Sequence, residues 1–152
     1  MTALVVDTSI AVKWVIDEPD SPKAKQLLAD WLSHGMTPLA PMLYVYEVSN
    51  VIRQQMRKHA ITIDEARDAL KALIESGPAL VAPPDVTTAS ALSTRALEFT
   101  HQLNLPAAYD AHYLALAERE GCEYWTADER LWNAVKAALP WVRWLGEYTP
   151  AP

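Results

Sequence analysis

The sequence predicts an α/β fold, a single domain in which a central parallel sheet of about five strands lies between two layers of helices. Short apolar segments alternate along the chain with longer segments whose apolar residues recur at helical spacing. The chain has 152 residues, of which 51% are hydrophobic, and this is enough for one buried core. We expect a domain over residues 1–147, followed by a frayed Pro-rich tail over residues 148–152.

The first predicted strand, residues 4–6, is an apolar run typical of a strand buried on both faces. It ends at Asp7, and the hydroxyl residues Thr8 and Ser9 precede a helix expected over residues 10–15. A carboxylate at this point lies at the carboxyl edge of the sheet, where open α/β sheets bind their ligands. Capping of the helix is the alternative role for Asp7, and this motif by itself leaves both roles open.

The next elements are marked by the residues at their ends. Ser21 followed by Pro22 is typical of a helix start, and His34 followed by Gly35 is typical of a helix end. The remaining strands are short apolar segments bounded by turn residues. They are predicted at residues 37–40, 79–82, 122–126 and 141–145.

A long helix is predicted over residues 43–59, and in it Glu47 and Asn50 lie one turn apart. Thr62 and Glu65 form a capping box, which opens the next helix. The later helices are predicted from apolar stripes at helical spacing, over residues 89–103, 110–121 and 129–138.

Composition limits the class of protein. The formal net charge of −6 argues against a broad basic surface for nucleic acid, but it leaves open an enzyme that acts on nucleic acid through bound cations. The only cysteine, Cys122, excludes an internal disulfide and favours a cytoplasmic location. We expect neither a signal peptide nor a membrane span.

Four acidic residues are predicted to lie near one edge of the sheet. Asp7 and Asp128 end strands that are each followed by a helix, while Asp110 and Glu47 lie near helix starts. Converging carboxylates raise one another's pKa, and a hard divalent cation relieves that repulsion. Mg²⁺, or alternatively Mn²⁺, suits a site built from oxygen ligands alone. Such a site can activate a water and stabilise the leaving oxygen of a phosphodiester.

Four motifs occur in a characteristic order: Asp7-Thr8-Ser9 with Lys13-Trp14, Glu47-Val48-Ser49-Asn50, Tyr109-Asp110-Ala111 with Tyr113-Leu114-Ala115-Leu116-Ala117, and Thr126-Ala127-Asp128-Glu129-Arg130-Leu131. Together they resemble the PIN domain, and specifically the VapC-like toxins of type II toxin–antitoxin modules. The resemblance spans essentially the whole chain and implies a PIN-like three-layer α/β/α fold. It also implies a magnesium- or manganese-dependent endoribonuclease, a homodimer and a cognate VapB-like antitoxin as partner, with tRNA or rRNA as substrate.

Carried over residue by residue, the resemblance makes Asp7 and Asp110 the principal metal ligands. Glu47 and Asp128 complete the acidic cluster, directly or through metal-bound water, and all four carboxylates are the candidate catalytic residues. Hydrogen-bonding residues that would orient the carboxylates are Thr8, Ser9, Asn50 and Thr126. For these residues, helix capping and turn formation are the alternative roles.

Three basic residues follow Glu47 on the same predicted helix: Arg53, Arg57 and Lys58. They are candidates for contact with RNA phosphates. Because charged residues on a solvated helix face are common, an ordinary surface role is the competing interpretation.

Other functions fit the residues less well. A phosphatase of the haloacid dehalogenase type also begins with a strand-ending Asp, but it needs a second Asp two positions on, where this chain has Ser9. A receiver-like module needs a central-strand Asp and a late Lys, and neither has a convincing counterpart. A catalytically silent PIN-like interaction module is the remaining alternative to the nuclease.

Overall fold

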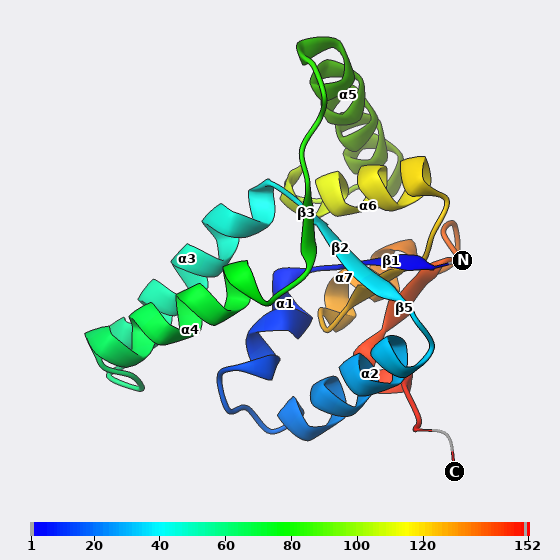
Figure 1. Ribbon diagram of the computed structural model, residues 1–152. Helices are drawn as coiled ribbons and strands as arrows, with labels where there is room; N and C mark the ends of the chain where they lie inside the picture. The colour runs from blue at the N-terminus through cyan, green and yellow to red at the C-terminus, as the bar shows by residue number, and fades with distance from the viewer. Residues whose placement is uncertain (1, 151) are drawn as a thin grey trace.

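The computed structural model describes residues 2–150 and 152 and contains a five-stranded, all-parallel sheet with the order β3-β2-β1-β4-β5 (Figure 1). The strands are β1 (Ala3–Val6), β2 (Thr37–Pro41), β3 (Ala79–Val81), β4 (Tyr124–Thr126) and β5 (Val142–Trp144). β1 is central, and Val5 lies opposite Leu39 of β2 on one side and Tyr124 of β4 on the other. The predicted fold class is therefore confirmed.

The helices are α1 (Thr8–Ala11), α2 (Ser21–Ser33), α3 (Leu43–Arg57), α4 (Ile63–Glu75), α5 (Val86–Leu103), α6 (Tyr109–Glu120) and α7 (Glu129–Val135), with 3₁₀ turns η1 (Val12–Trp14) and η2 (Leu145–Glu147). Their apolar residues form two separate core clusters, one on each face of the sheet. Val5 belongs to the cluster with residues of α3 to α7, whereas Leu4 and Val6 belong to the cluster with α1 and α2. Successive residues of a strand point to opposite faces, so β1 contributes to both layers.

Several predicted boundaries shift in the structure. The helix expected over residues 10–15 begins earlier, at Thr8, and continues as the 3₁₀ turn η1, because Asp7 caps it through the Ser9 N–H. Ser21 is the first residue of α2 rather than its cap. The buried Ser21 hydroxyl donates to the Ile16 carbonyl (3.0 Å) and accepts from the Glu18 N–H (2.9 Å), and so closes the preceding loop.

Other end signals are confirmed. Thr62 and Glu65 form the predicted capping box of α4, and α2 ends at Ser33 with His34 as its C-cap, as the His34-Gly35 pair predicts. α3 and α4 pack side by side as an antiparallel pair (Figure 1), and α5 packs against α6. None of the helices in the described part of the chain is both long and apolar enough to cross a bilayer.

The end of the chain contacts the domain. Tyr148, the first residue of the predicted tail, packs its ring edge-on against Trp125 (centroids 6.4 Å apart) and donates a hydrogen bond to the Asp30 carboxylate. Met1 and Ala151 lie outside the described residues.

Candidate active site

The carboxyl ends of β1 and β4, one side of α3 and the first turn of α6 border one pocket of about 380 Å³. All four predicted carboxylates line it: Asp7, Glu47, Asp110 and Asp128. They come from four separate segments, and the parallel topology brings them together because strands β1 and β4 are neighbours and end at the same edge. Thr8, Ser9 and Lys58 line the same pocket.

Asp7 is a buried carboxylate that is held by four hydrogen bonds. Oδ1 accepts from the Ser9 N–H (3.0 Å) and the Ser9 hydroxyl (2.5 Å), and Oδ2 accepts from the hydroxyls of Thr126 (2.6 Å) and Tyr124 (2.7 Å). Burial raises the pKa of Asp7, and the hydrogen bonds of Ser9, Thr126 and Tyr124 oppose this rise. Asp7 therefore both caps α1 and lines the pocket.

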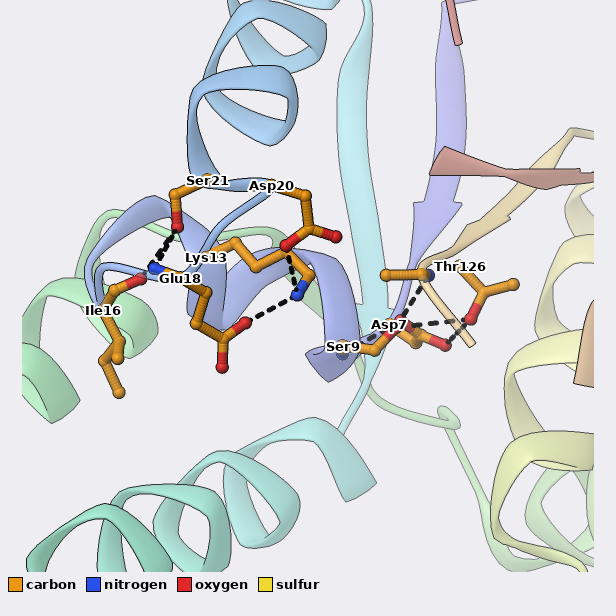
Figure 2. A network of polar contacts seen from close by, with 9 residues as sticks. Asp7, Ser9, Lys13, Ile16, Glu18, Asp20, Ser21 and Thr126 are labelled. Atoms are coloured by element: carbon orange, nitrogen blue, oxygen red, sulfur yellow. Dashed lines mark hydrogen bonds and ion pairs between the residues drawn. The ribbon is translucent and has the colours of Figure 1, made fainter. Parts of the chain in front are cut away.

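Ser9 and Thr126 also join the two strand ends to each other (Figure 2). The Ala127 N–H donates to the Ser9 hydroxyl (2.8 Å), and the Asp128 N–H donates to the Thr126 hydroxyl (3.0 Å). These two predicted orienting residues thus contact Asp7 and fix the backbone that precedes Asp128. The Thr8 hydroxyl lies 3.3 Å from the Tyr113 hydroxyl.

Glu47 of α3 and Asp110 of α6 both line the pocket. Glu47 accepts a hydrogen bond from the Tyr113 hydroxyl (2.6 Å), and its pKa is raised mainly by burial and also by the charge of Asp7. Burial, followed by the charges of Asp7, Glu47 and Asp128, raises the pKa of Asp110 to about 7. Among residues 2–150 and 152, no side chain or N–H donates a hydrogen bond to the Asp110 carboxylate.

Asp128 is exposed and caps α7, where its Oδ1 accepts from the N–H groups of Arg130 (2.9 Å) and Leu131 (3.1 Å). Its charge still contributes to the raised pKa of Asp110.

Asn50 is exposed, does not line the pocket, and bonds to no carboxylate in the described part of the chain. The structure does not bring it to the site: α3 lines the pocket with Glu47, Val51, Gln54 and Gln55, and Asn50 lies on the exposed side of the helix.

Two buried tyrosines, which sequence reasoning missed, donate hydrogen bonds to the carboxylates of Asp7 and Glu47. Tyr124 donates to Asp7 and Tyr113 donates to Glu47, and their rings stack with centroids 5.9 Å apart at an angle of 13°. The signal was present, because Tyr124 precedes Thr126 by two residues in a strand and Tyr113 follows Asp110 by three in a helix. Residues at these spacings share a face with the site residue.

We expect Tyr124→Phe to destabilise the protein by about 1.5–3 kcal/mol, because it removes a buried hydrogen bond to a charged group. Urea denaturation of the metal-free protein measures this loss. Tyr148→Phe is the matched control, since the Tyr148 hydroxyl also donates to a carboxylate, that of Asp30, but outside the pocket. Its cost should stay below about 1 kcal/mol. Equal losses in the two variants would contradict a supporting role for Tyr124.

Lys13 provides a fixed positive charge in the pocket wall (Figure 2). Its side chain is 13% exposed and lies 2.6 Å from the Glu18 carboxylate and 2.8 Å from that of Asp20. Burial disfavours the charge, but the hydrogen bonds to Asp20 and Glu18 outweigh burial and raise the Lys13 pKa. Two carboxylates therefore neutralise Lys13, and it does not balance the acidic cluster.

The predicted basic residues lie on the C-terminal half of α3. Lys58 and Gln54 line the far end of the pocket, and with Arg57 they line an adjoining hollow of about 300 Å³. Arg53 is exposed and lines neither. Within the described residues, Arg53, Arg57 and Lys58 form no ion pair.

The donor set determines which ligand fits this pocket. In the part of the chain that the structure describes, no three His, Cys, Asp or Glu side chains are arranged to hold a metal ion as they stand. Mg²⁺, however, keeps several waters and is commonly held by one or two carboxylates. Asp110, which has no hydrogen-bond donor and has carboxylates around it, is the group whose charge a cation would relieve. The residues therefore fit a hydrated divalent ion rather than an all-protein cage.

Comparisons with known proteins identify the family and the fold. The family model of the PIN domain matches residues 4–137. A crystal structure of VapC20 from Mycobacterium tuberculosis, described as a sarcin–ricin loop cleaving toxin, superposes with a TM-score of 0.64. The match covers 89% of this chain and 95% of that one at 15% sequence identity, which is a likeness of fold. No curated protein matches the sequence significantly.

Proposed function

The chain belongs to the PIN domain family, and from this premise we propose that it is a divalent-metal-dependent endoribonuclease, the toxin of a VapBC-type toxin–antitoxin pair. The observation that supports this most is the uncompensated negative charge at Asp110, whose pKa is raised to about 7 by burial and by Asp7, Glu47 and Asp128. A pocket with this charge repels a phosphodiester unless a cation is bound in it. The proposed chemistry requires that same cation.

In this proposal Asp7 and Asp110 hold the ion, and Glu47 and Asp128 act directly or through water. Bound Mg²⁺ or Mn²⁺ supplies a water of lowered pKa and stabilises charge on the leaving oxygen. Ser9, Thr126 and Tyr124 keep the Asp7 carboxylate in one orientation, and Tyr113 does the same for Glu47. Such hydrogen-bonding partners orient metal ligands and tune their basicity. Lys58, which also lines the pocket, would bind a phosphate of the RNA.

Partners follow from the same proposal. A VapB-like antitoxin would inhibit by placing an Arg or Lys side chain among the carboxylates, where charge-assisted hydrogen bonds are strong. The homodimer and the cytoplasmic location are part of the proposal on the same family basis. Since the structural neighbour is described as cleaving the sarcin–ricin loop, ribosomal RNA and tRNA are the substrates to test first.

We expect the purified protein to cleave RNA in Mg²⁺ or Mn²⁺ and to lose this activity in excess EDTA. Gel analysis of total RNA, with mapping of the cut ends, measures it. Asp68→Asn, which changes an exposed acid on α4, is the control and should cleave like the wild type. Any antitoxin that co-purifies is removed before the assay. Absence of cleavage under all metal conditions would then favour the catalytically silent module.

A further inference from the structure

The candidate pocket is lined by a fifth carboxylate, that of Glu18, which the proposed cation site does not use. Its charge is separate from the acidic cluster, because the pKa of Asp110 is raised by the charges of the other three acids of that cluster and not by Glu18. A further negative charge in a pocket for a polyanion is unfavourable unless it has a partner. Glu18 therefore has a purpose other than holding the ion.

Lys13 holds the Glu18 side chain in position (Figure 2). The Lys13 ammonium lies 2.6 Å from Glu18 Oε2. The backbone is held as well, because the Glu18 N–H donates to the buried Ser21 hydroxyl (2.9 Å). In the described part of the chain, Glu18 Oε1 accepts no hydrogen bond. Glu18 thus presents a fixed carboxylate with one oxygen available to a ligand.

Apolar and amide side chains line the same pocket, whose volume of about 380 Å³ lies in the range typical of sites for small organic ligands. Val12 of η1 and Val51 of α3 line it from two elements, and α1, which leads into η1, packs against α3. The side-chain amides of Gln54 and Gln55 bond to no described residue, whereas that of Gln26 donates to a carboxylate on its own helix. Apolar surface beside available polar groups suits a ligand with a flat face and a hydrogen-bonding edge, as a nucleobase has.

The chemistry of a carboxylate determines which base it fits. An ionised carboxylate only accepts hydrogen bonds, so it pairs with an edge that presents donors. Guanine is the one RNA base whose Watson–Crick edge carries two adjacent donors, N1–H and the N2 amino group. Adenine and cytosine each place an acceptor beside their amino group, and uracil places carbonyl oxygens on both sides of its N3–H. A fixed carboxylate therefore favours guanine over the other three bases.

We propose that Glu18 is a specificity-determining residue, whose carboxylate accepts hydrogen bonds from N1–H and the N2 amino group of a guanine next to the cleaved phosphodiester. Lys13 is the positioning residue that holds this carboxylate, and Val12 and Val51 contact the face of the base. The inference rests on the proposed nuclease function and adds the base that the pocket selects. Glu18 takes no part in the bond-breaking step.

Cleavage of an RNA pool with randomised positions, followed by sequencing of the cut ends, tests the inference. We expect the wild type in Mg²⁺ to cut with guanine enriched at one fixed position beside the cleaved bond. Glu18→Gln replaces one acceptor oxygen with a donor. The ratio of kcat/KM for guanine to kcat/KM for adenine at this position should therefore fall at least about 10-fold.

Asp20→Asn is the matched control. Asp20 also pairs with Lys13 (2.8 Å) but does not line the pocket, so this variant disturbs the same ion pairs and should keep the guanine preference. Lys13→Met should lower the preference, because the Glu18 carboxylate then loses the ammonium that holds it. A loss of folding stability changes cleavage beside all four bases equally, so the ratio separates base recognition from a merely structural ion pair.

Inosine, which lacks only the N2 amino group of guanine, gives a second readout. Placed at the selected position of one labelled RNA, it should lower kcat/KM of the wild type about 5-fold or more, as the loss of one hydrogen bond to a charged group does. Glu18→Gln should cleave the guanine and inosine RNAs at nearly equal rates. An equal effect of inosine on both proteins would overturn the inference.

The outcomes identify what failed. If the wild type cleaves RNA without a preference for guanine, or if Glu18→Gln keeps the wild-type preference, only this inference is wrong. A Glu18→Gln protein that keeps the preference but escapes inhibition by a co-expressed antitoxin would assign Glu18 to the antitoxin, whose Arg side chains also present paired donors. If the wild type cleaves no RNA, the proposed function itself is wrong, and this inference with it.

Discussion

Replacing Asp7 with Asn is expected to lower the rate of RNA cleavage by a factor on the order of 10³ or more. Loss of an outer hydrogen-bonding partner of a metal ligand already costs about 10–100-fold, and Asp7 is a proposed ligand itself. Asn carries no charge, so one of the two principal carboxylates of the proposed ion site is lost. The measurement is single-turnover cleavage of a labelled RNA in saturating Mg²⁺.

The same substitution is also expected to affect stability. The Asp7 carboxylate accepts two hydrogen bonds on each oxygen, whereas Asn keeps one acceptor oxygen and presents to the other pair of donors an amide nitrogen that cannot accept. Leaving buried hydroxyls unpaired costs about 1–3 kcal/mol, so Asp7→Asn should unfold at lower urea. Circular dichroism of the folded variant therefore belongs with the rate measurement, and a folded Asp7→Asn protein that cleaves at the native rate would refute the assignment.

Replacing Asp110 with Asn should instead stabilise the metal-free protein at alkaline pH. The pKa of Asp110 is raised from 3.8 to about 7 in the folded state, so the folded protein keeps a proton that the unfolded chain has lost. Stability contributed by that proton is present below about pH 4 and disappears as pH rises to about 7. The Asp7 and Glu47 pKa values are raised as well, so the wild type should lose stability over this range.

The size of the Asp110 effect follows from its surroundings. Solvent in the pocket screens part of the repulsion, and we expect Asp110→Asn to gain on the order of 1–2 kcal/mol at pH 8, or a rise in Tm of roughly 3–6 °C. Thermal unfolding in EDTA at pH 5 and pH 8 measures it. Mg²⁺ should raise the Tm of the wild type at pH 8 but not that of the variant. Equal Tm values for the wild type and Asp110→Asn at both pH values would contradict the proposed repulsion among the carboxylates.

The order of strands and helices could be predicted because each element carries its own periodicity, and because parallel strands need helical crossovers. The carboxyl edge then follows from topology, so Asp7 and Asp128 could be placed together without coordinates. The role of Ser21 could not be predicted in this way. Its hydroxyl donates a hydrogen bond to the Ile16 carbonyl instead of capping α2, and this contact depends on the path of the preceding loop, which no local sequence pattern specifies.

Sequence reasoning placed the four acids of the candidate site and two of the residues that bond Asp7, Ser9 and Thr126, but it missed the two tyrosines. Tyr113 and Tyr124 looked like ordinary core residues because a hydrogen bond from a buried hydroxyl leaves no trace in hydrophobic periodicity. Asn50 shows the opposite error, since a polar residue near Glu47 in the sequence was expected near the pocket, and helix rotation turns it to the exposed side. Side-chain direction, rather than element type, is what separates the two cases.

Calorimetric titration of the metal-free protein with Mn²⁺ at pH 7, repeated in two buffers of different ionisation enthalpy, tests the central claim most directly. Because the pKa of Asp110 is raised to about 7, a fraction of the molecules carries a proton there at this pH, and the bound ion should displace it. We predict binding that releases protons, and loss of both the binding and the proton release in Asp110→Asn. Absence of binding, or binding that Asp110→Asn leaves unchanged, would contradict a cation site among these carboxylates.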